Sequence, residues 1–177
     1  MKYVNLFESF IIENRNKDIY SLMRPFFDKT PEYVFKELYY THNGFFKNEF
    51  IDLINQNADD EEIEDTFSEW IDLKWKKQII EVNFNDFNEK TQIFMKDRKM
   101  GMLDLTDIPN DKERNNLHRD LATNDGKNEP VIITKTSEGY ELLEGWHRTM
   151  SILSLGSDGT DNYEYWDKVK LNAWIGN

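Results

Sequence analysis

The sequence contains no cysteine, and this absence excludes several classes of protein at once. Without cysteine there is no disulfide framework, no zinc–thiolate site and no cysteine nucleophile. No apolar run approaches the roughly 18 residues that a membrane-spanning helix needs. The stretch from Met1 to Asn5 also lacks the apolar core and small-residue cleavage site of a secretory signal. We therefore expect a soluble, cytoplasmic protein that makes no membrane contact.

Positive charge is also scarce, with 22 Lys and Arg against 34 Asp and Glu and a formal net charge of -12. Broad, non-specific binding to nucleic acid requires a basic surface, so this balance argues against it. A local basic site can still exist on an acidic surface, and an acidic chain of this size can also occupy a basic groove on a partner protein. Apolar residues make up 38% of the 177 residues, including 12 Phe, 8 Tyr and 5 Trp. This content is sufficient for a packed core.

Apolar residues recur at helical spacing through the first half of the chain. Thr30-Pro31 predicts a helix start, because a hydroxyl N-cap is followed by proline at the first helical position. Asn43-Gly44 predicts the end of that helix. The acidic run from Asp59 to Glu62 favours the start of a further helix that continues to Ile71. The expected helices cover 4–11, 19–27, 30–43, 46–54 and 59–71.

Near residue 78 the pattern changes to alternation, and Ile80, Val82 and Phe84 predict a strand. Two further apolar runs, separated by a Ser-Glu-Gly turn, predict a β-hairpin. These observations predict an α+β fold with a helical N-terminal region, 1–77, and a small mixed sheet-and-helix domain, 78–177. In that domain we expect helices over 85–96, 117–121 and 146–155, and strands over 80–84, 131–134, 140–143 and 169–175.

The sharpest chemical motif is the Glu-Gly-Trp-His-Arg-Thr stretch at 144–149, where a strand leads into a helix. A helix N-terminus binds anions through its free amide groups and the positive end of its dipole. Gly145 has no Cβ, so a phosphate can approach the backbone, and His147 and Arg148 supply charge-assisted donors. Glu144 could hold a metal ion, orient the histidine or accept a proton. The motif is typical of a phosphate-binding turn; the alternative is a surface arginine and a capping histidine.

Residues 130–133, followed by 139–148, resemble the ParB/sulfiredoxin superfamily, in which a proline-led strand and a hairpin precede a Gly-x-His-Arg turn that opens a helix. The resemblance covers 78–177 at most, and its specific part is 130–155. It implies a small α+β fold that binds a nucleoside triphosphate with Mg²⁺, with Glu144 and His147 as catalytic residues. The phosphate-binding residues that it implies are Gly145, His147, Arg148 and Thr149, and the second-rank candidates are His118 and Arg119.

The chain departs from the individual members of this superfamily. Trp146 stands where sulfiredoxin has its reactive cysteine, which excludes sulfinic acid reduction. The sequence ends at Asn177 just after the last expected strand, so we do not expect the helix-turn-helix domain that follows the nucleotide fold of ParB segregation proteins. The general-base glutamate of the free-serine kinase has no assigned position here. The sequence at 118–121 resembles the catalytic loop of protein kinases, but Asn124 lies one residue too close, which favours coincidence.

Three functions remain open from the sequence. The first is a nucleotide-binding protein that acts as a Mg-dependent NTP hydrolase or phosphotransferase. The second is a non-catalytic, phage-encoded acidic module that binds a host or phage protein in the host cytoplasm. The third is a ParB-like nuclease, against which the net charge of -12 counts.

Overall fold

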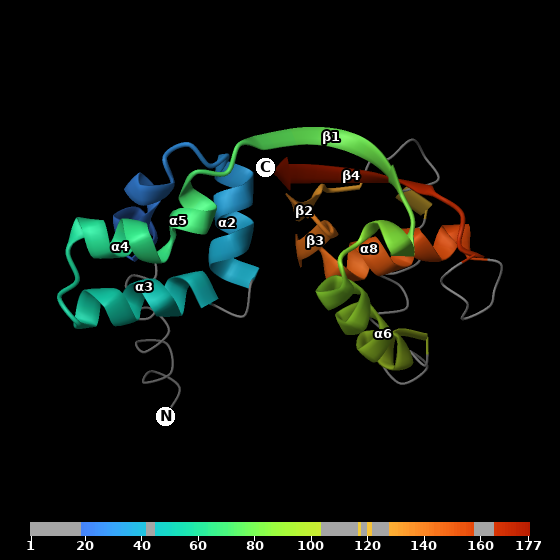
Figure 1. The fold of residues 1–177 in the computed structure, drawn as a ribbon, viewed down its shortest axis with the longest axis horizontal. Coiled ribbons are helices and arrows are strands. Elements are labelled where there is room, and N and C mark those ends of the chain that lie inside the picture. The colour runs from blue at the N-terminus through green and yellow to red at the C-terminus, as the bar shows by residue number, and fades with distance from the viewer. Residues whose placement is uncertain (1–18, 42–44, 104–116, 118–119, 122–127, 158–164) are drawn as a thin grey trace, which may run out of the picture. The chain divides into compact units, whose positions relative to one another are not determined.

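The computed structural model describes the chain except for residues 1–18, 42–44, 104–116, 118–119, 122–127 and 158–164. The fold is α+β, as predicted, with helices first and a four-stranded mixed sheet after them (Figure 1). The chain divides into two compact units, Met1–Leu73 and Lys74–Asn177. The boundary expected after residue 77 falls inside the first strand, Trp75–Val82. Over the described residues, no helix has the length and apolar character that a membrane crossing requires.

The first unit consists of short helices. Residues 19–23 are helical and continue into a 3-10 turn where Pro25 interrupts the helix. The helices expected over 30–43 and 46–54 are confirmed, and the helix expected over 4–11 lies outside the described residues. The elements are η1 Arg24–Phe27, α2 Glu32–Thr41, α3 Phe45–Asn55, α4 Asp60–Thr66 and α5 Ser68–Ile71.

The prediction of a single helix over 59–71 was wrong, because the chain forms two helices that meet at Phe67. Asp59 and Glu62 form a capping box that starts α4. At Phe67 the backbone leaves helical geometry (φ -103°, ψ 12°), and its N–H group donates to the carbonyls of Ile63 and Asp65. The ring of Phe67 is 1% exposed and lies among the other aromatic rings of this unit. The apolar spacing fits one helix equally well, so it could not show the break.

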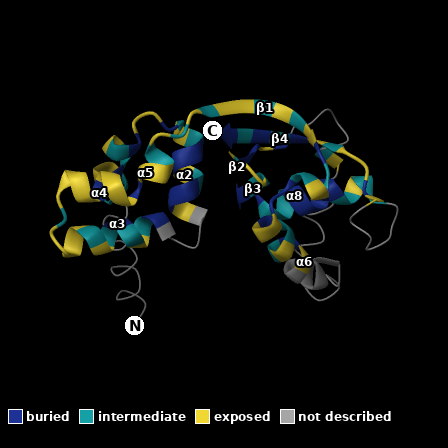
Figure 2. Cartoon of the chain, in the orientation of Figure 1, coloured by how far each residue is buried: buried dark blue, intermediate teal, exposed yellow. Residues whose placement is uncertain are grey.

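An aromatic core holds the first unit together (Figure 2). Phe27 contacts the rings of Phe35, Phe46 and Phe67, with centroids 5.3, 6.0 and 5.6 Å away. Buried aromatic pairs at these distances stabilise a core beyond the effect of their buried area. The buried Phe residues of this unit are therefore structural.

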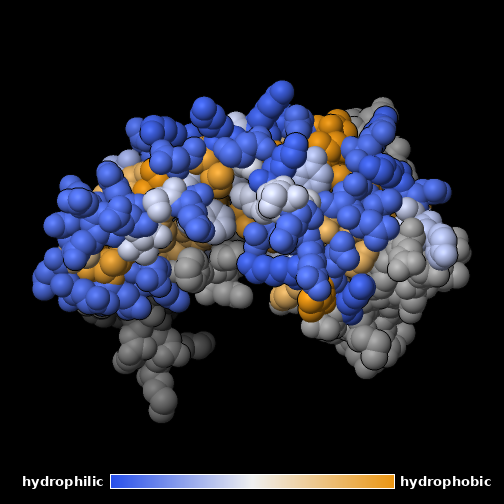
Figure 3. Space-filling view, viewed as in Figure 1, coloured by the Kyte–Doolittle hydropathy of each residue, from blue (hydrophilic) through white to orange (hydrophobic). Residues whose placement is uncertain are grey.

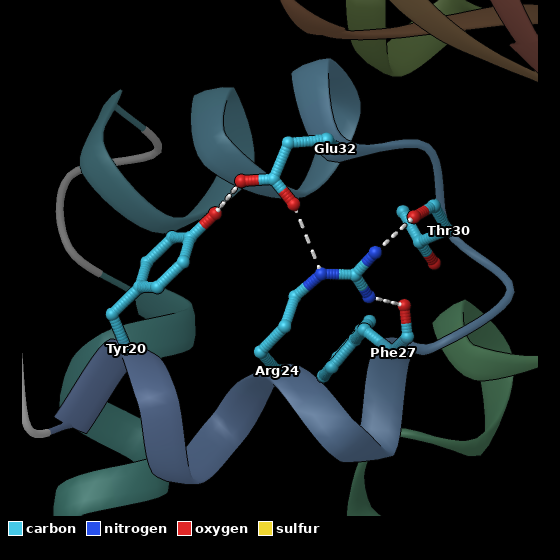
Figure 4. A network of polar contacts seen from close by, with 5 residues as sticks. All are labelled: Tyr20, Arg24, Phe27, Thr30 and Glu32. Atoms are coloured by element: carbon cyan, nitrogen blue, oxygen red, sulfur yellow. Dashed lines mark hydrogen bonds and ion pairs between the residues drawn. The ribbon is translucent and has the colours of Figure 1, made fainter.

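A polar network joins η1 to the start of α2 (Figure 4). The guanidinium of Arg24 donates to the carbonyl of Phe27 and, at 3.0 Å, to the carbonyl of Thr30. Its Nε lies 3.1 Å from one carboxylate oxygen of Glu32, and the Tyr20 hydroxyl donates to the other. The bond from Tyr20 holds the pKa of Glu32 below its usual value. Burial and the bond to Glu32 raise the pKa of Tyr20 well above its usual value.

The second unit is built on a sheet with strand order β1-β4-β2-β3. The β2–β4 pair is parallel, and the other two pairs are antiparallel. The predicted hairpin, the helix after it and the final strand are confirmed. The elements are β1 Trp75–Val82, η2 Phe84–Asp86, α6 Glu89–Leu103, β2 Val131–Thr136, β3 Gly139–Glu144, α8 Trp146–Leu153, η4 Ser154–Gly156 and β4 Val169–Gly176.

The first strand differs from its prediction at both ends. It begins at Trp75, within a stretch assigned to the helical region, and ends at Val82. Phe84 belongs to the 3-10 turn η2, because Asn83 and Asp86 form a capping box there. The Asn83 N–H donates to Asp86 Oδ2 at 2.8 Å. Of the helix expected over 117–121, residues 118 and 119 lie outside the described residues.

The core of the second unit lies between one face of the sheet and helices α6 and α8 (Figure 2). This covering of one sheet face by helices is the usual arrangement of an α+β unit. Figure 3 shows that the surface of the protein on the side in view is mostly hydrophilic, with small apolar areas between the hydrophilic ones. The buried residues of this core include Met95, Val131, Ile133, Leu142, Met150, Leu153, Leu171, Ala173 and Ile175.

The segment between β1 and α6, together with the first turn of α6, covers the outer edge of β3. Phe87 forms an isolated bridge with Tyr140, and the Asn88 N–H donates to the Tyr140 carbonyl at 2.9 Å. The Leu142 N–H donates to the Thr91 hydroxyl oxygen at 3.1 Å. This edge of the sheet is therefore hydrogen-bonded by the chain itself.

Candidate functional site

The strand–helix junction after β3 is fixed by Gly145. Its φ is 93°, in the left-handed region that favours glycine. A Cβ at this position would lie 2.6 Å from Cγ1 of Val131, so the turn also needs a residue without a side chain. Helix α8 starts at Trp146, and its first backbone bond runs from the Thr149 N–H to the Gly145 carbonyl at 2.8 Å. Because the N-cap is glycine, no N-cap side chain binds the amide groups of the first turn.

Arg148 ties this turn to the residues before β2. Its Nη1 donates to the Pro130 carbonyl at 3.0 Å and lies 3.6 Å from a carboxylate oxygen of Glu129. The Arg148 side chain is 11% exposed, whereas that of Glu129 is 79% exposed. The arginine therefore has a structural role, and its ion pair reaches the surface.

The other residues of the motif lie around the same turn. The Trp146 ring contacts the Phe94 ring of α6, with centroids 4.1 Å apart. Glu144 is half-buried and pairs with Ile132 of β2. His147 is also half-buried, while Thr149 is fully buried, and its hydroxyl has no hydrogen-bond partner within the described part of the chain.

The predicted site residues 144–149 thus form one compact group at the end of β3. The second-rank candidates His118 and Arg119 lie outside the described residues. Sequence reasoning missed Glu129, Val131 and Phe94, which contact this turn. No local signal could have identified them, because their contacts depend on how β2 and α6 pack beside the turn.

Residues that could hold a metal ion are few. Among the described residues no group of three or more His, Asp or Glu side chains is arranged for metal binding. Mg²⁺ in nucleotide sites is usually held by phosphates and waters with one or two carboxylates. Such an ion fits this turn only if it arrives with the nucleotide, and the carboxylates of Glu144 and Glu129 lie at the turn.

Comparison of the chain with protein-family models, with curated proteins and with solved structures finds no match. The functional argument therefore rests on the residues of this turn and on their geometry.

Proposed function

We propose that the chain binds the phosphates of a nucleotide at the glycine-capped start of α8. The observation that supports this proposal is Gly145, a left-handed N-cap without a side chain that opens a helix directly after a strand. Amide groups in a first helical turn attract anions, and the helix dipole adds to the attraction. The half-buried His147 and the Arg148 guanidinium stand in the same turn and add donors.

The ion pair between Arg148 and Glu129 indicates how an anion would be accommodated. The two groups are 3.6 Å apart, and the carboxylate side chain is largely exposed. An incoming phosphate would take the place of the Glu129 carboxylate, while the bond from Arg148 to Pro130 keeps the guanidinium in position. A phosphate carries more negative charge and more acceptor oxygens than a carboxylate, so the exchange is favourable.

Hydrolysis or phosphoryl transfer is the reaction class that we propose for this site. The bond between the terminal phosphorus and its bridging oxygen breaks, and a bond to water or an acceptor hydroxyl forms. Glu144 or His147 accepts the proton that the attacking oxygen loses. His147 and Arg148 stabilise the negative charge on the transferred group. Mg²⁺, when bound with the nucleotide, neutralises phosphate charge.

The test is direct measurement of binding of ATP, CTP, GTP and UTP by calorimetry, with and without Mg²⁺. We expect one nucleotide to bind the wild-type chain and the Arg148→Ala variant to lose at least about tenfold in affinity. Lys135→Ala, at an exposed position of the β2–β3 hairpin, is the matched charge-removal control and should bind as wild type. Nucleotide hydrolysis that persists in the His147→Ala, Arg148→Ala double variant would contradict the roles proposed for these two residues.

Glu129→Gln should change nucleotide affinity in the opposite direction to Arg148→Ala. The substitution removes the carboxylate that competes with phosphate for Arg148 and leaves the Pro130 contact in place. We expect nucleotide affinity to rise by about two- to fivefold, the effect of one partly screened charge. Unchanged affinity in this variant, beside a loss in Arg148→Ala, would place the phosphate away from Glu129.

A non-catalytic binding module is the second candidate function. It is favoured by the contacts of Arg148, which stabilise the turn without any ligand. Under this alternative no nucleotide binds, and the acidic surface engages a partner protein. Absence of binding for all four nucleotides, together with a defined complex recovered from a native lysate, supports it.

A further inference from the structure

The two outer edges of the sheet differ in how they are covered. The edge at β3 is bonded by the segment that contains Asn88 and Thr91. The opposite edge is β1, an eight-residue strand with no strand beyond it among the described residues (Figure 1). An uncovered edge strand is a template for pairing with another strand.

The register shows which backbone groups of β1 face outward. Lys74 and Asn177 exchange two hydrogen bonds, N–H to carbonyl in each direction, so they form a hydrogen-bonded pair of the antiparallel ladder. Such pairs alternate along a ladder, and β1 and β4 pair without a register shift from Trp75 to Val82. The N–H and carbonyl groups that point away from β4 are therefore those of Trp75, Lys77, Ile79 and Glu81.

The side chains on this edge are self-complementary about Ile79. The Ile79 side chain is 55% exposed, which is unusual for a β-branched residue in the middle of a strand. Lys77 lies two residues before it and Glu81 two residues after it, and both are exposed. Because side chains alternate along a strand, these three share one face of the sheet.

We propose that β1 pairs with β1 of a second copy of this chain, antiparallel and centred on Ile79. In this register Ile79 faces Ile79, and each Lys77 faces the Glu81 of the other copy. Each of these three cross-strand pairs exchanges two backbone bonds, so six new hydrogen bonds form. The two four-stranded sheets join into one continuous sheet.

Charge selects this register among the symmetric ones. Centring the pair on Lys77 would place two lysines directly opposite one another, which is unfavourable. Centring it on Gln78 would place Lys77 opposite Ile79 and lose both ion pairs. Lysines on an edge strand often prevent pairing; here Lys77 prevents the wrong registers and stabilises the one centred on Ile79.

A charge-exchange series tests the pairing. We expect sedimentation equilibrium of the full chain to show a rise in mass from 21.3 kDa to twice that value as concentration increases. Lys77→Glu and Glu81→Lys should each weaken the dimer by at least about tenfold, because two symmetric attractive pairs become repulsive. The double variant, Lys77→Glu with Glu81→Lys, should restore the dimer, because the pairs are attractive again. Circular dichroism of each variant confirms that the fold is retained.

The absence of cysteine in the chain allows a second, geometric test. Residues of a hydrogen-bonded pair have Cα atoms about 5.5 Å apart, within the range of a disulfide. Mild oxidation of Ile79→Cys should therefore give a covalent dimer. Ile93→Cys, at a helical position that is 51% exposed, is the matched control and should remain monomeric.

Three results would overturn the proposal. If the chain stays monomeric up to near-millimolar concentration, β1 does not pair with a second copy, and a strand from a different protein would be its partner instead. Equal crosslinking at positions 79 and 93 indicates random collision, and failure of the double charge variant to dimerise contradicts the register. None of these measurements depends on nucleotide, so their outcome is independent of the function proposed for the turn at α8.

Discussion

The turn at Gly145 depends on a single residue type. Gly145→Ala should lower the free energy of unfolding by about 2 kcal/mol or more, because an alanine in the left-handed region is strained. The new Cβ would also lie 2.6 Å from Val131 Cγ1. Urea unfolding followed by circular dichroism measures the loss.

A double-mutant cycle measures how much of this loss comes from the overlap with Val131 Cγ1. In the Val131→Ala background the overlap with Cγ1 is gone, so Gly145→Ala should cost less there than in the wild-type chain. Equal losses in both backgrounds would mean that the contact with Cγ1 adds nothing to the backbone strain and to the remaining contact with the Cβ of residue 131, 2.9 Å away. Wild-type stability of Gly145→Ala would contradict the geometry of the turn.

Single residues also show which features of the site can be predicted from the sequence and which cannot. The glycine between β3 and α8 could be identified from the sequence as a site where a ligand can approach the backbone, but its left-handed φ and its close approach to Val131 could not. The bond from Arg148 to the Pro130 carbonyl was not predictable, since it joins residues 18 positions apart. It forms only because the start of β2 packs beside α8. The sequence therefore showed which residues could bind an anion or accept a proton, but not which of them already have structural partners.

At the scale of elements, the start of α4 rests on a capping box. The Asp59 carboxylate accepts from the Glu62 N–H at 3.0 Å, and the Glu62 carboxylate accepts from the Asp59 N–H at 3.0 Å. Asp59→Ala should therefore lower the free energy of unfolding by about 1 kcal/mol. Asp60→Ala, one residue further on, removes the same charge without a capping bond and is the matched control. Equal losses in the two variants would assign the effect to charge near the helix dipole.

One buried hydroxyl joins α6 to β3. The Thr91 hydroxyl oxygen accepts from the Leu142 N–H, and Thr91 is 1% exposed. Thr91→Val keeps the shape but leaves a buried N–H group without an acceptor, so we expect a loss of about 1–3 kcal/mol. Thr91→Ser retains the hydroxyl and should lose less. Thermal and urea unfolding measure both, and a neutral Thr91→Val would show that the amide finds another acceptor.

The elements themselves were predictable wherever the signal was local. The hairpin and the helix after it carry turn residues and clear periodicity, and both were confirmed. The break at Phe67 and the early start of β1 were missed for a different reason. Phe67 fits helical spacing, and Lys76 and Lys77 are poor strand formers that lie in a strand because β4 pairs with them. Tertiary pairing overrides local preference at these positions.

At the scale of the whole molecule, the raised pKa values of the half-buried Tyr20 and the buried Tyr39 predict a loss of stability in alkali. Burial raises the pKa of Tyr39 to about 12, and burial with the bond to Glu32 also raises the pKa of Tyr20. A tyrosine in the unfolded chain ionises near its ordinary pKa of 10.0. Above that pH the unfolded chain binds fewer protons than the folded chain, so the free energy of unfolding falls as pH rises. Below it, both tyrosines are protonated in both states and their contribution is constant.

Urea unfolding at a series of pH values from neutral to strongly alkaline measures this slope. Tyr39→Phe and Tyr20→Phe should each flatten the alkaline decline, because each removes one group whose folded pKa is raised. Tyr165→Phe is the matched control, since this side chain is 73% exposed, and it should leave the profile unchanged. Tyrosinate absorbance provides an independent readout: the folded chain should retain protonated tyrosine at a pH where the urea-unfolded chain has ionised. Coincident absorbance titrations of the folded and unfolded chains would contradict the raised pKa values of Tyr20 and Tyr39, and with them the burial of Tyr39 in the aromatic core of the first unit.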